Sequence, residues 1–225
     1  MTNQIENKVQ MGVKTAQNIM ELAIRNVATV YISQHLPWKR GEQMQTERSF
    51  AYELYHQWSK LNEYYYKIHS NESPVLIQGE ITKEMKSLSG RNQNWFPDLV
   101  LHEGQNSVQN QLMVCEIKRF LNNKPDQKSI KNDLKKLLGY MNLMHSFEEN
   151  KDSNFKSAVF LGISLVKEDL EDGIKSLLRG NKKLCKELKA HASEIWCYCV
   201  YQDNDRGFCD FEKIQLSKII KEVER

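Results

Sequence analysis

Three charged side chains interrupt a stretch that is otherwise typical of two buried β-strands. The stretch WFPDLVLHEGQNSVQNQLMVCEIKR, residues 95–119, holds Asp98 in its first apolar run, and Glu116 and Lys118 in its second. Charges inside buried strands carry a desolvation cost unless a partner offsets it. Because side chains alternate between the faces of a strand, Glu116 and Lys118 share one face. Pairing the two runs as an antiparallel hairpin brings Asp98 beside both of them.

Such a cluster has a chemical use. Two carboxylates, Asp98 and Glu116, together with the backbone carbonyl of Ile117 and water molecules, suit octahedral Mg²⁺ or Mn²⁺. Lys118 would stabilise developing negative charge or orient the attacking water, which the metal makes more acidic. These are the groups needed to hydrolyse a phosphodiester bond, so the sequence predicts a metal-dependent phosphodiesterase.

The pattern resembles the signature of the PD-(D/E)xK nuclease superfamily. Pro97-Asp98 lies on one predicted strand, Glu116-x-Lys118 lies on the next, and a helix predicted over Ser129–His145 follows. The resemblance implies an α/β restriction-endonuclease-like fold, a mixed β-sheet flanked by helices. It also implies an endonuclease that acts on DNA and leaves a 5′-phosphate and a 3′-hydroxyl. One such site cuts one strand, so cleavage of both strands would require a homodimer or two binding events.

Family members often carry a further glutamate, and two residues of this chain compete for that role. Glu53 lies beside the apolar stripe of a helix predicted over residues 46–64, and Glu80 lies in a strand predicted over VLIQGEITK. Either would complete the catalytic set. The alternative is a solvated helix flank for Glu53 and an exposed strand face for Glu80, and the sequence does not decide between these interpretations.

Basic residues supply candidate nucleic-acid contacts. Arg91 lies in a polar loop just before the first strand of the hairpin, while Lys131 and Lys135 lie on the helix that follows the second. Side chains of this kind contact phosphate backbones. A solvated helix face is the alternative for each lysine.

The chain reads as one α/β unit: a helical N-terminal extension over residues 1–45 and a nuclease domain over 46–225. The extension would supply a dimer interface or pack on the domain. Helices are expected over 4–34, 46–64, 129–145, 167–192 with a weak point at Gly180-Asn181, and 211–224. Strands are expected over 75–83, on both sides of a 102–111 loop, and over 155–166 and 194–202.

Composition bounds the class of protein. The 225 residues are 40% hydrophobic and carry a net charge of +3, which excludes a histone-like polybasic binder. We expect a cytoplasmic protein with no membrane segment, because no apolar run reaches about 20 residues and the N-terminus lacks the pattern of a secretory signal. Five cysteines without CxxC spacing indicate reduced, mostly buried thiols.

Two rival functions stay open. One is a non-catalytic domain of the same fold that binds nucleic acid or serves as a scaffold. The other is a structural or interaction protein in which Lys118 forms an ion pair with Asp98 or Glu116. Glycine-rich phosphate loops, GxSxG elbows and HExxH motifs do not occur in the sequence, so it offers no other familiar catalytic chemistry.

Overall fold

The computed structural model describes ten segments of the chain in detail. These are residues 9–32, 47–70, 72–79, 83–86, 92–102, 111–119, 127–142, 155–164, 170–203 and 205–225.

The central sheet is built from six strands: β3 (Leu76–Gly79), β6 (Leu99–His102), β7 (Gln111–Arg119), β8 (Ser157–Ile163), β9 (Ile195–Gln202) and β10 (Cys209–Gln215). Their order is β10-β9-β8-β7-β6-β3. The middle strands β7, β8 and β9 run parallel, whereas β3, β6 and β10 pair antiparallel with their neighbours. The expected α/β class with a mixed sheet is confirmed.

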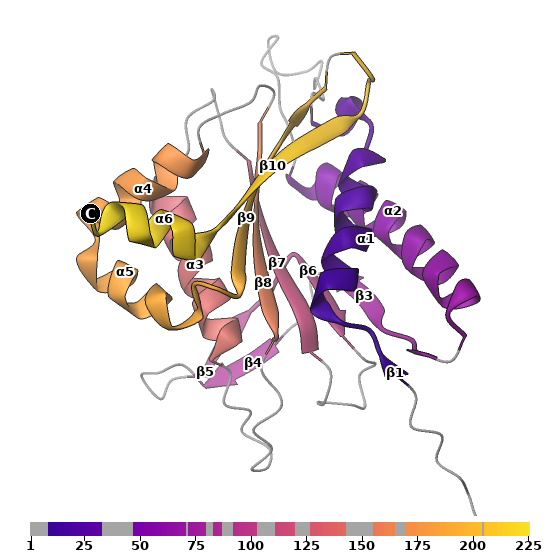
Figure 1. The fold of residues 1–225 in the computed structure, drawn as a ribbon, viewed down its shortest axis with the longest axis horizontal. Helices are drawn as coiled ribbons and strands as arrows, with labels where there is room; N and C mark the ends of the chain where they lie inside the picture. Colours follow the sequence, from indigo (N-terminus) through magenta and orange to yellow (C-terminus); the bar gives the residue numbers. More distant parts are fainter. Residues whose placement is uncertain are drawn as a thin grey trace, which may run out of the picture.

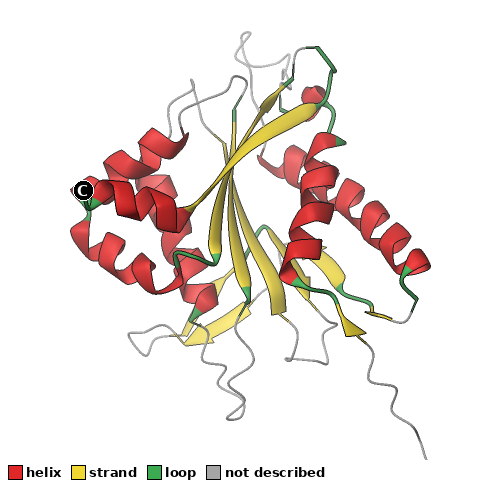
Figure 2. Ribbon diagram, viewed as in Figure 1, coloured by secondary structure: helices red, strands yellow, loops and turns green. Residues whose placement is uncertain are grey.

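Helices cover both faces of this sheet. They are α1 (Val13–Arg25), α2 (Glu47–Ile68), α3 (Gln127–Met141), α4 (Leu170–Gly180), α5 (Lys182–Leu188) and α6 (Leu216–Val223), with 3₁₀ turns η1 (Thr29–Tyr31) and η2 (Lys189–His191). Helices α1 and α2 pack on one face, and α3 to α6 pack on the other (Figure 1). Figure 2 shows the resulting order of layers, with helices on either side of the strands.

Two small sheets accompany the main one. Strand β1 (Val9–Gln10) pairs in parallel with β2 (Glu72–Ser73), and β4 (Lys83–Lys86) pairs antiparallel with β5 (Asn92–Trp95). The strand expected over residues 75–83 is therefore shorter in the structure: β3 ends at Gly79, and Lys83 begins a separate hairpin.

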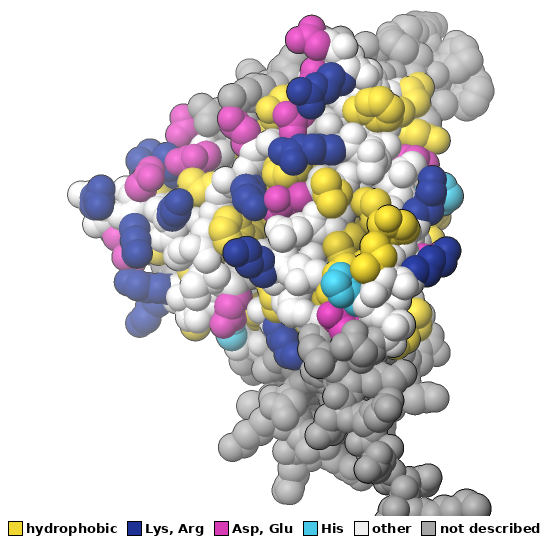
Figure 3. All heavy atoms as spheres, turned by 45° about the vertical axis from the view of Figure 1, so that its right-hand side comes forward, with side chains coloured by type: hydrophobic (Ala, Val, Ile, Leu, Met, Phe, Trp, Pro, Cys, Tyr) yellow, Lys and Arg dark blue, Asp and Glu magenta, His cyan; other side chains and the backbone are white. Residues whose placement is uncertain are grey.

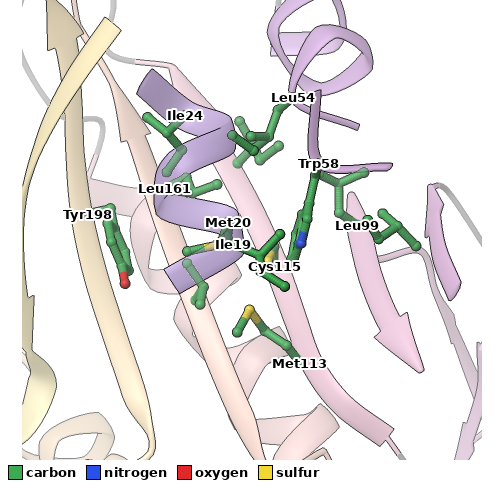
Figure 4. Close-up of a cluster of buried hydrophobic side chains, with 14 of the residues drawn as sticks. Ile19, Met20, Ile24, Leu54, Trp58, Leu99, Met113, Cys115, Leu161 and Tyr198 are labelled. Atoms are coloured by element: carbon green, nitrogen blue, oxygen red, sulfur yellow. The ribbon is translucent and has the colours of Figure 1, made fainter. Parts of the chain in front are cut away.

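The core beneath α1 and α2 is made of large apolar side chains. Met20 and Ile24 of α1 and Trp58 of α2 are fully buried. Figure 4 shows Met20 and Trp58 around the β7 side chain Cys115, and Ile24 near Leu161 of β8. Burial of side chains of this size is the main favourable term that holds the two helices on the sheet. Residues of the expected N-terminal extension thus share a core with the sheet, while the boundary at residue 45 stays a prediction.

The opposite core forms because the parallel strands need crossover connections. Helix α3 joins β7 to β8, and α4 with α5 joins β8 to β9. All seven residues of β8 are buried, which confirms a central strand covered on both faces. The expected weak point between Gly180 and Asn181 is where α4 ends and α5 begins.

Two expected helices are wrong in extent. The helix expected over 4–34 spans only Val13–Arg25 among the described residues, because residues 27–29 pair with 207–209 instead: the Cys209 N–H donates to the Val27 carbonyl at 2.8 Å. The helix expected over 211–224 begins at Leu216. The preceding residues form β10, which pairs with β9 in unbroken register. In both places, pairing with a distant or adjacent strand overrides local helical periodicity.

The helices expected over 46–64 and 129–145 are confirmed as α2 and α3, with ends shifted by a few residues. The antiparallel pairing of the central hairpin is also confirmed, with Leu99 opposite Cys115. The described part of the chain holds no helix long and apolar enough to cross a membrane.

Candidate functional site

Asp98 lies where the hairpin ladder ends. It directly precedes β6, and the register that sets Leu99 opposite Cys115 sets Asp98 opposite Glu116. Its Oδ2 accepts a hydrogen bond of 2.6 Å from the backbone N–H of Ile117. The N–H and C=O of one strand residue point to the same side of that strand, so the Ile117 carbonyl points to the side of β7 on which Asp98 lies.

Glu116 is almost completely buried, with 1% of its surface exposed. It faces α3, where Lys136 Nζ lies 2.8 Å from Oε2 and the Tyr140 hydroxyl donates a 3.2 Å hydrogen bond to Oε1. The same lysine lies 3.2 Å from Oδ1 of Asp133, one turn earlier on α3. A single ammonium group therefore serves two buried carboxylates.

We call Asp98, Glu116 and Asp133 the inner acids. Burial raises the pKa of Asp98 to about 6, although the Ile117 N–H and Lys136 act in the opposite direction. The pKa of Glu116 rises to about 8, first because of burial and then because of the negative charge of Asp98. Burial likewise raises the pKa of Asp133. When all three are ionised, their negative charges outnumber the positive charges of Lys136 and Lys118, both of which act on this group.

Lys118 lies at the rim of this group and is held by α2. Its Nζ is 2.9 Å from Oε1 of Glu47, and the same oxygen accepts a hydrogen bond from the Arg119 backbone N–H at 3.1 Å. Burial lowers the pKa of Lys118, but Glu47, Asp133 and Asp98 outweigh that effect, so the net pKa is raised. The ammonium group stays charged and is oriented by Glu47.

The donors fit a divalent cation in part. Asp98, Glu116 and the Ile117 carbonyl are oxygen ligands of the kind that Mg²⁺ takes. In the described segments, however, no three histidine, cysteine, aspartate or glutamate side chains form a group able to hold a metal ion by themselves. A Mg²⁺ site here would rely on the carbonyl, water and substrate oxygens, and Mg²⁺ commonly binds through one or two carboxylates plus phosphates.

The remaining expected site residues are not gathered here. Glu53 accepts a 2.6 Å hydrogen bond from Gln57, and helical geometry sets it roughly 120° around α2 from Glu47. Lys131 hydrogen-bonds to Asn181. Lys131 and Lys135 lie roughly 150° around α3 from the side that carries Asp133, Lys136 and Tyr140. Glu80 and Arg91 lie outside the described residues.

Four residues of the site were not expected: Glu47, Asp133, Lys136 and Tyr140. The sequence does contain a sign of Asp133, because this residue interrupts the apolar stripe of α3 between Ile130 and Leu134. A charge within such a stripe is costly unless it has a partner. Glu47 is an acid in the first turn of α2, where the helix dipole alone accounts for it. Its contact with Lys118 depends on the tertiary fold.

An open cavity of about 590 Å³ adjoins the cluster. Asp98 and Glu47 line it together with other residues of α2, β3 and the start of β6. Asp98 is thus the inner acid at which the cavity meets the cluster.

Comparison with known proteins finds no match: no protein-family model, curated protein or solved structure matches this chain.

Proposed function

We propose that the protein is a metal-dependent nuclease of the restriction-endonuclease-like fold that hydrolyses phosphodiester bonds in DNA. The observation that carries the proposal is the gathering of three acids at the end of the β6–β7 hairpin: Glu116 and Asp133 are buried against Lys136, Asp98 is half-buried beside them, and Lys118 lies at their rim. A structural ion pair would match its charges, whereas the inner acids and Glu47 together outnumber Lys136 and Lys118 by two when all are ionised.

The chain's own residues have separable roles in this proposal. Asp98, Glu116 and the Ile117 carbonyl would hold Mg²⁺ or Mn²⁺. When bound, the ion supplies a Lewis acid that makes a bound water more acidic and offsets phosphate charge. Lys118, oriented by Glu47 at 2.9 Å, would stabilise the charge that develops on the phosphate during attack by water. Lys136 forms ion pairs with Glu116 and Asp133 and would orient the two carboxylates.

A second function has one observation in its favour. The Ile117 N–H satisfies Asp98, and Lys136 and Tyr140 satisfy Glu116, so the acids are hydrogen-bonded without any ion. This arrangement favours a non-catalytic domain of the same fold that binds nucleic acid, with the acids serving only the structure.

The two functions differ in a cleavage assay. We expect the purified chain to cut plasmid and single-stranded DNA with Mg²⁺ or Mn²⁺, and not with EDTA. Asp98→Ala, Glu116→Gln and Lys118→Ala should each lower the rate about 100-fold or more, because each removes a group that acts on the transition state. Two exposed residues of α2 give matched controls, Glu63→Gln and Lys60→Ala, which should cleave like the wild type.

Equal cleavage by all the variants would point to a contaminating nuclease and contradict the catalytic assignment. DNA binding without cleavage under every metal condition would favour the second function. Binding is therefore measured on the same preparations.

A further inference from the structure

The cavity beside Asp98 has one aromatic wall. Tyr52 and Tyr55 of α2 line it and keep 62% and 40% of their surface exposed. Helix α2 lies on the right-hand side of Figure 1, and Figure 3 turns this side forward, where hydrophobic side chains are interspersed with lysine and arginine. Aromatic faces in solvent forfeit the burial that normally stabilises them, so their presence in a cavity favours a ligand with flat apolar faces.

Polar side chains line the cavity beside the tyrosines. Arg48 lies one residue after Glu47 in the first turn of α2, and Gln78 of β3 lies across from the helix. Asp98 and Glu47 add two carboxylates to the lining. A ligand would therefore meet carboxylates, the tyrosines of the helix and the exposed guanidinium group of Arg48, which attracts phosphate.

The dimensions suit a short run of bases. Glu47 and Tyr55 are eight residues apart on α2, which corresponds to about 12 Å along the helix axis. Stacked bases are spaced at about 3.4 Å, so this length matches about three of them. A cavity of about 590 Å³ also lies within the range of sites that bind small organic groups.

We propose that this cavity binds unpaired nucleobases, so that the substrate is DNA with a single-stranded segment at the point of cleavage. The proposal rests on the proposed function, because it assigns the phosphate next to the bound bases to the inner acids. Tyrosine stacks on a base only when the face of that base is free, and in a duplex both faces are covered by neighbours. Arg48 provides the charge complementarity for the backbone that leaves the cavity.

A binding experiment in EDTA tests this inference without requiring cleavage. A fluorescein-labelled oligothymidylate of about 12 nucleotides, a length within the usual range of single-strand sites, is titrated with the full chain and followed by anisotropy. Tyr52→Ala and Tyr55→Ala should each weaken binding roughly 5- to 150-fold, the range that the loss of one stacked base produces. Tyr52→Phe and Tyr55→Phe should bind like the wild type, because they keep the ring.

Tyr64→Ala is the matched control. Tyr64 lies on the same helix with 63% of its surface exposed, about 18 Å from Tyr52 along the axis and outside the cavity lining. It should leave binding unchanged. Unlabelled duplex of matched sequence should compete at least tenfold less well than the single strand.

Three results would overturn the inference: no binding by the wild type, equal affinity of Tyr52→Ala and Tyr64→Ala, or equal competition by duplex. Failure of the proposed function looks different. Tyrosine-dependent binding with no cleavage in Mg²⁺ would leave the cavity assignment standing and remove the nuclease. Cleavage that depends on Asp98 but not on the tyrosines would do the reverse.

Discussion

At the scale of single residues, Lys136 is the group that most favours the charged form of Glu116, because its charge and its hydrogen bond both lower a pKa that burial raises. The lysine ammonium is the one group within 4 Å that forms an ion pair with this carboxylate in the described part of the chain. A buried carboxylate without a partner costs several kcal/mol or takes up a proton. The buried Glu116 carboxylate and the Lys136 ammonium group therefore depend on each other for their stability in the interior.

Lys136→Met should destabilise the protein and make it more responsive to divalent cations. We expect the free energy of unfolding in EDTA to fall by about 1–2 kcal/mol, less than for a fully buried pair because Lys136 is one-third exposed. Mg²⁺ should then raise the midpoint of urea unfolding more in the variant than in the wild type, since the ion replaces the lost charge.

Lys135→Met provides the control, because its side chain is exposed on the neighbouring position of α3. It should match the wild type in both conditions. An Mg²⁺ response that is the same in Lys136→Met and Lys135→Met would argue against a cation site at the inner acids.

The raised pKa of Glu116 predicts a pH dependence of stability. Between its ordinary value of 4.5 and about 8, the folded chain binds this proton more tightly than the unfolded chain does. The free energy of unfolding therefore falls as pH rises through that interval. Glu116→Gln cannot ionise, so its stability relative to the wild type should increase from about pH 5 to about pH 8.5.

Urea unfolding in EDTA at the two pH values measures this difference, and Glu63→Gln should show none. A relative stability of Glu116→Gln that declines with pH would mean that Glu116 is ionised in the folded protein at pH 5, against the raised pKa.

At the scale of elements, local sequence patterns predict the helices and strands that short-range interactions determine. The apolar stripe of α2, the alternation of the β6–β7 hairpin and the apolar run of β8 each determine their own element. Strand β10 was missed because its partner β9, and the turn that joins them, decide the conformation of residues that also fit a helix. Glu47 was missed because only the packing of α2 on the end of β7 brings it to Lys118.

Two glycines at element boundaries should respond oppositely to alanine. A Cβ on Gly180, the last residue of α4, would meet nothing within 4 Å, and its φ is not in the left-handed region. Gly180→Ala should stabilise the chain by about 0.5–1 kcal/mol. Gly207 has φ of +71° in the turn before β10, so Gly207→Ala should destabilise it by about 1–2 kcal/mol.

Thermal unfolding of the two variants beside the wild type measures these changes. A lower midpoint for Gly180→Ala would mean that the break between α4 and α5 requires glycine and is not simply a weak point in the helix.

At the scale of the whole molecule, α1 belongs to the main core. Five of its residues are buried, among them Met20 and Ile24, against strands of the six-stranded sheet. A chain that begins at residue 46 would expose the face of the sheet that α1 covers, so we expect it to lose cooperative unfolding and to bind hydrophobic dyes.

Single substitutions give the same test without deletion. Ile24→Ala should cost about 2–4 kcal/mol, as expected for a fully buried side chain, whereas Leu22→Ala should change stability by less than about 0.5 kcal/mol because Leu22 is 53% exposed. A cooperative, dye-silent chain 46–225 would show that the first 45 residues are a separable extension.

The pairing of residues 27–29 with 207–209 also bears on how the chain folds during synthesis. The Thr29 N–H donates to the Gly207 carbonyl at 3.0 Å, so residues 27–29 are completed by a segment made roughly 180 residues later. Ribosomes add about 5–20 residues per second, so residues 27–29 would wait roughly 10–40 s for this partner. During that interval, a chaperone that binds extended segments would have its best access to this part of the nascent chain.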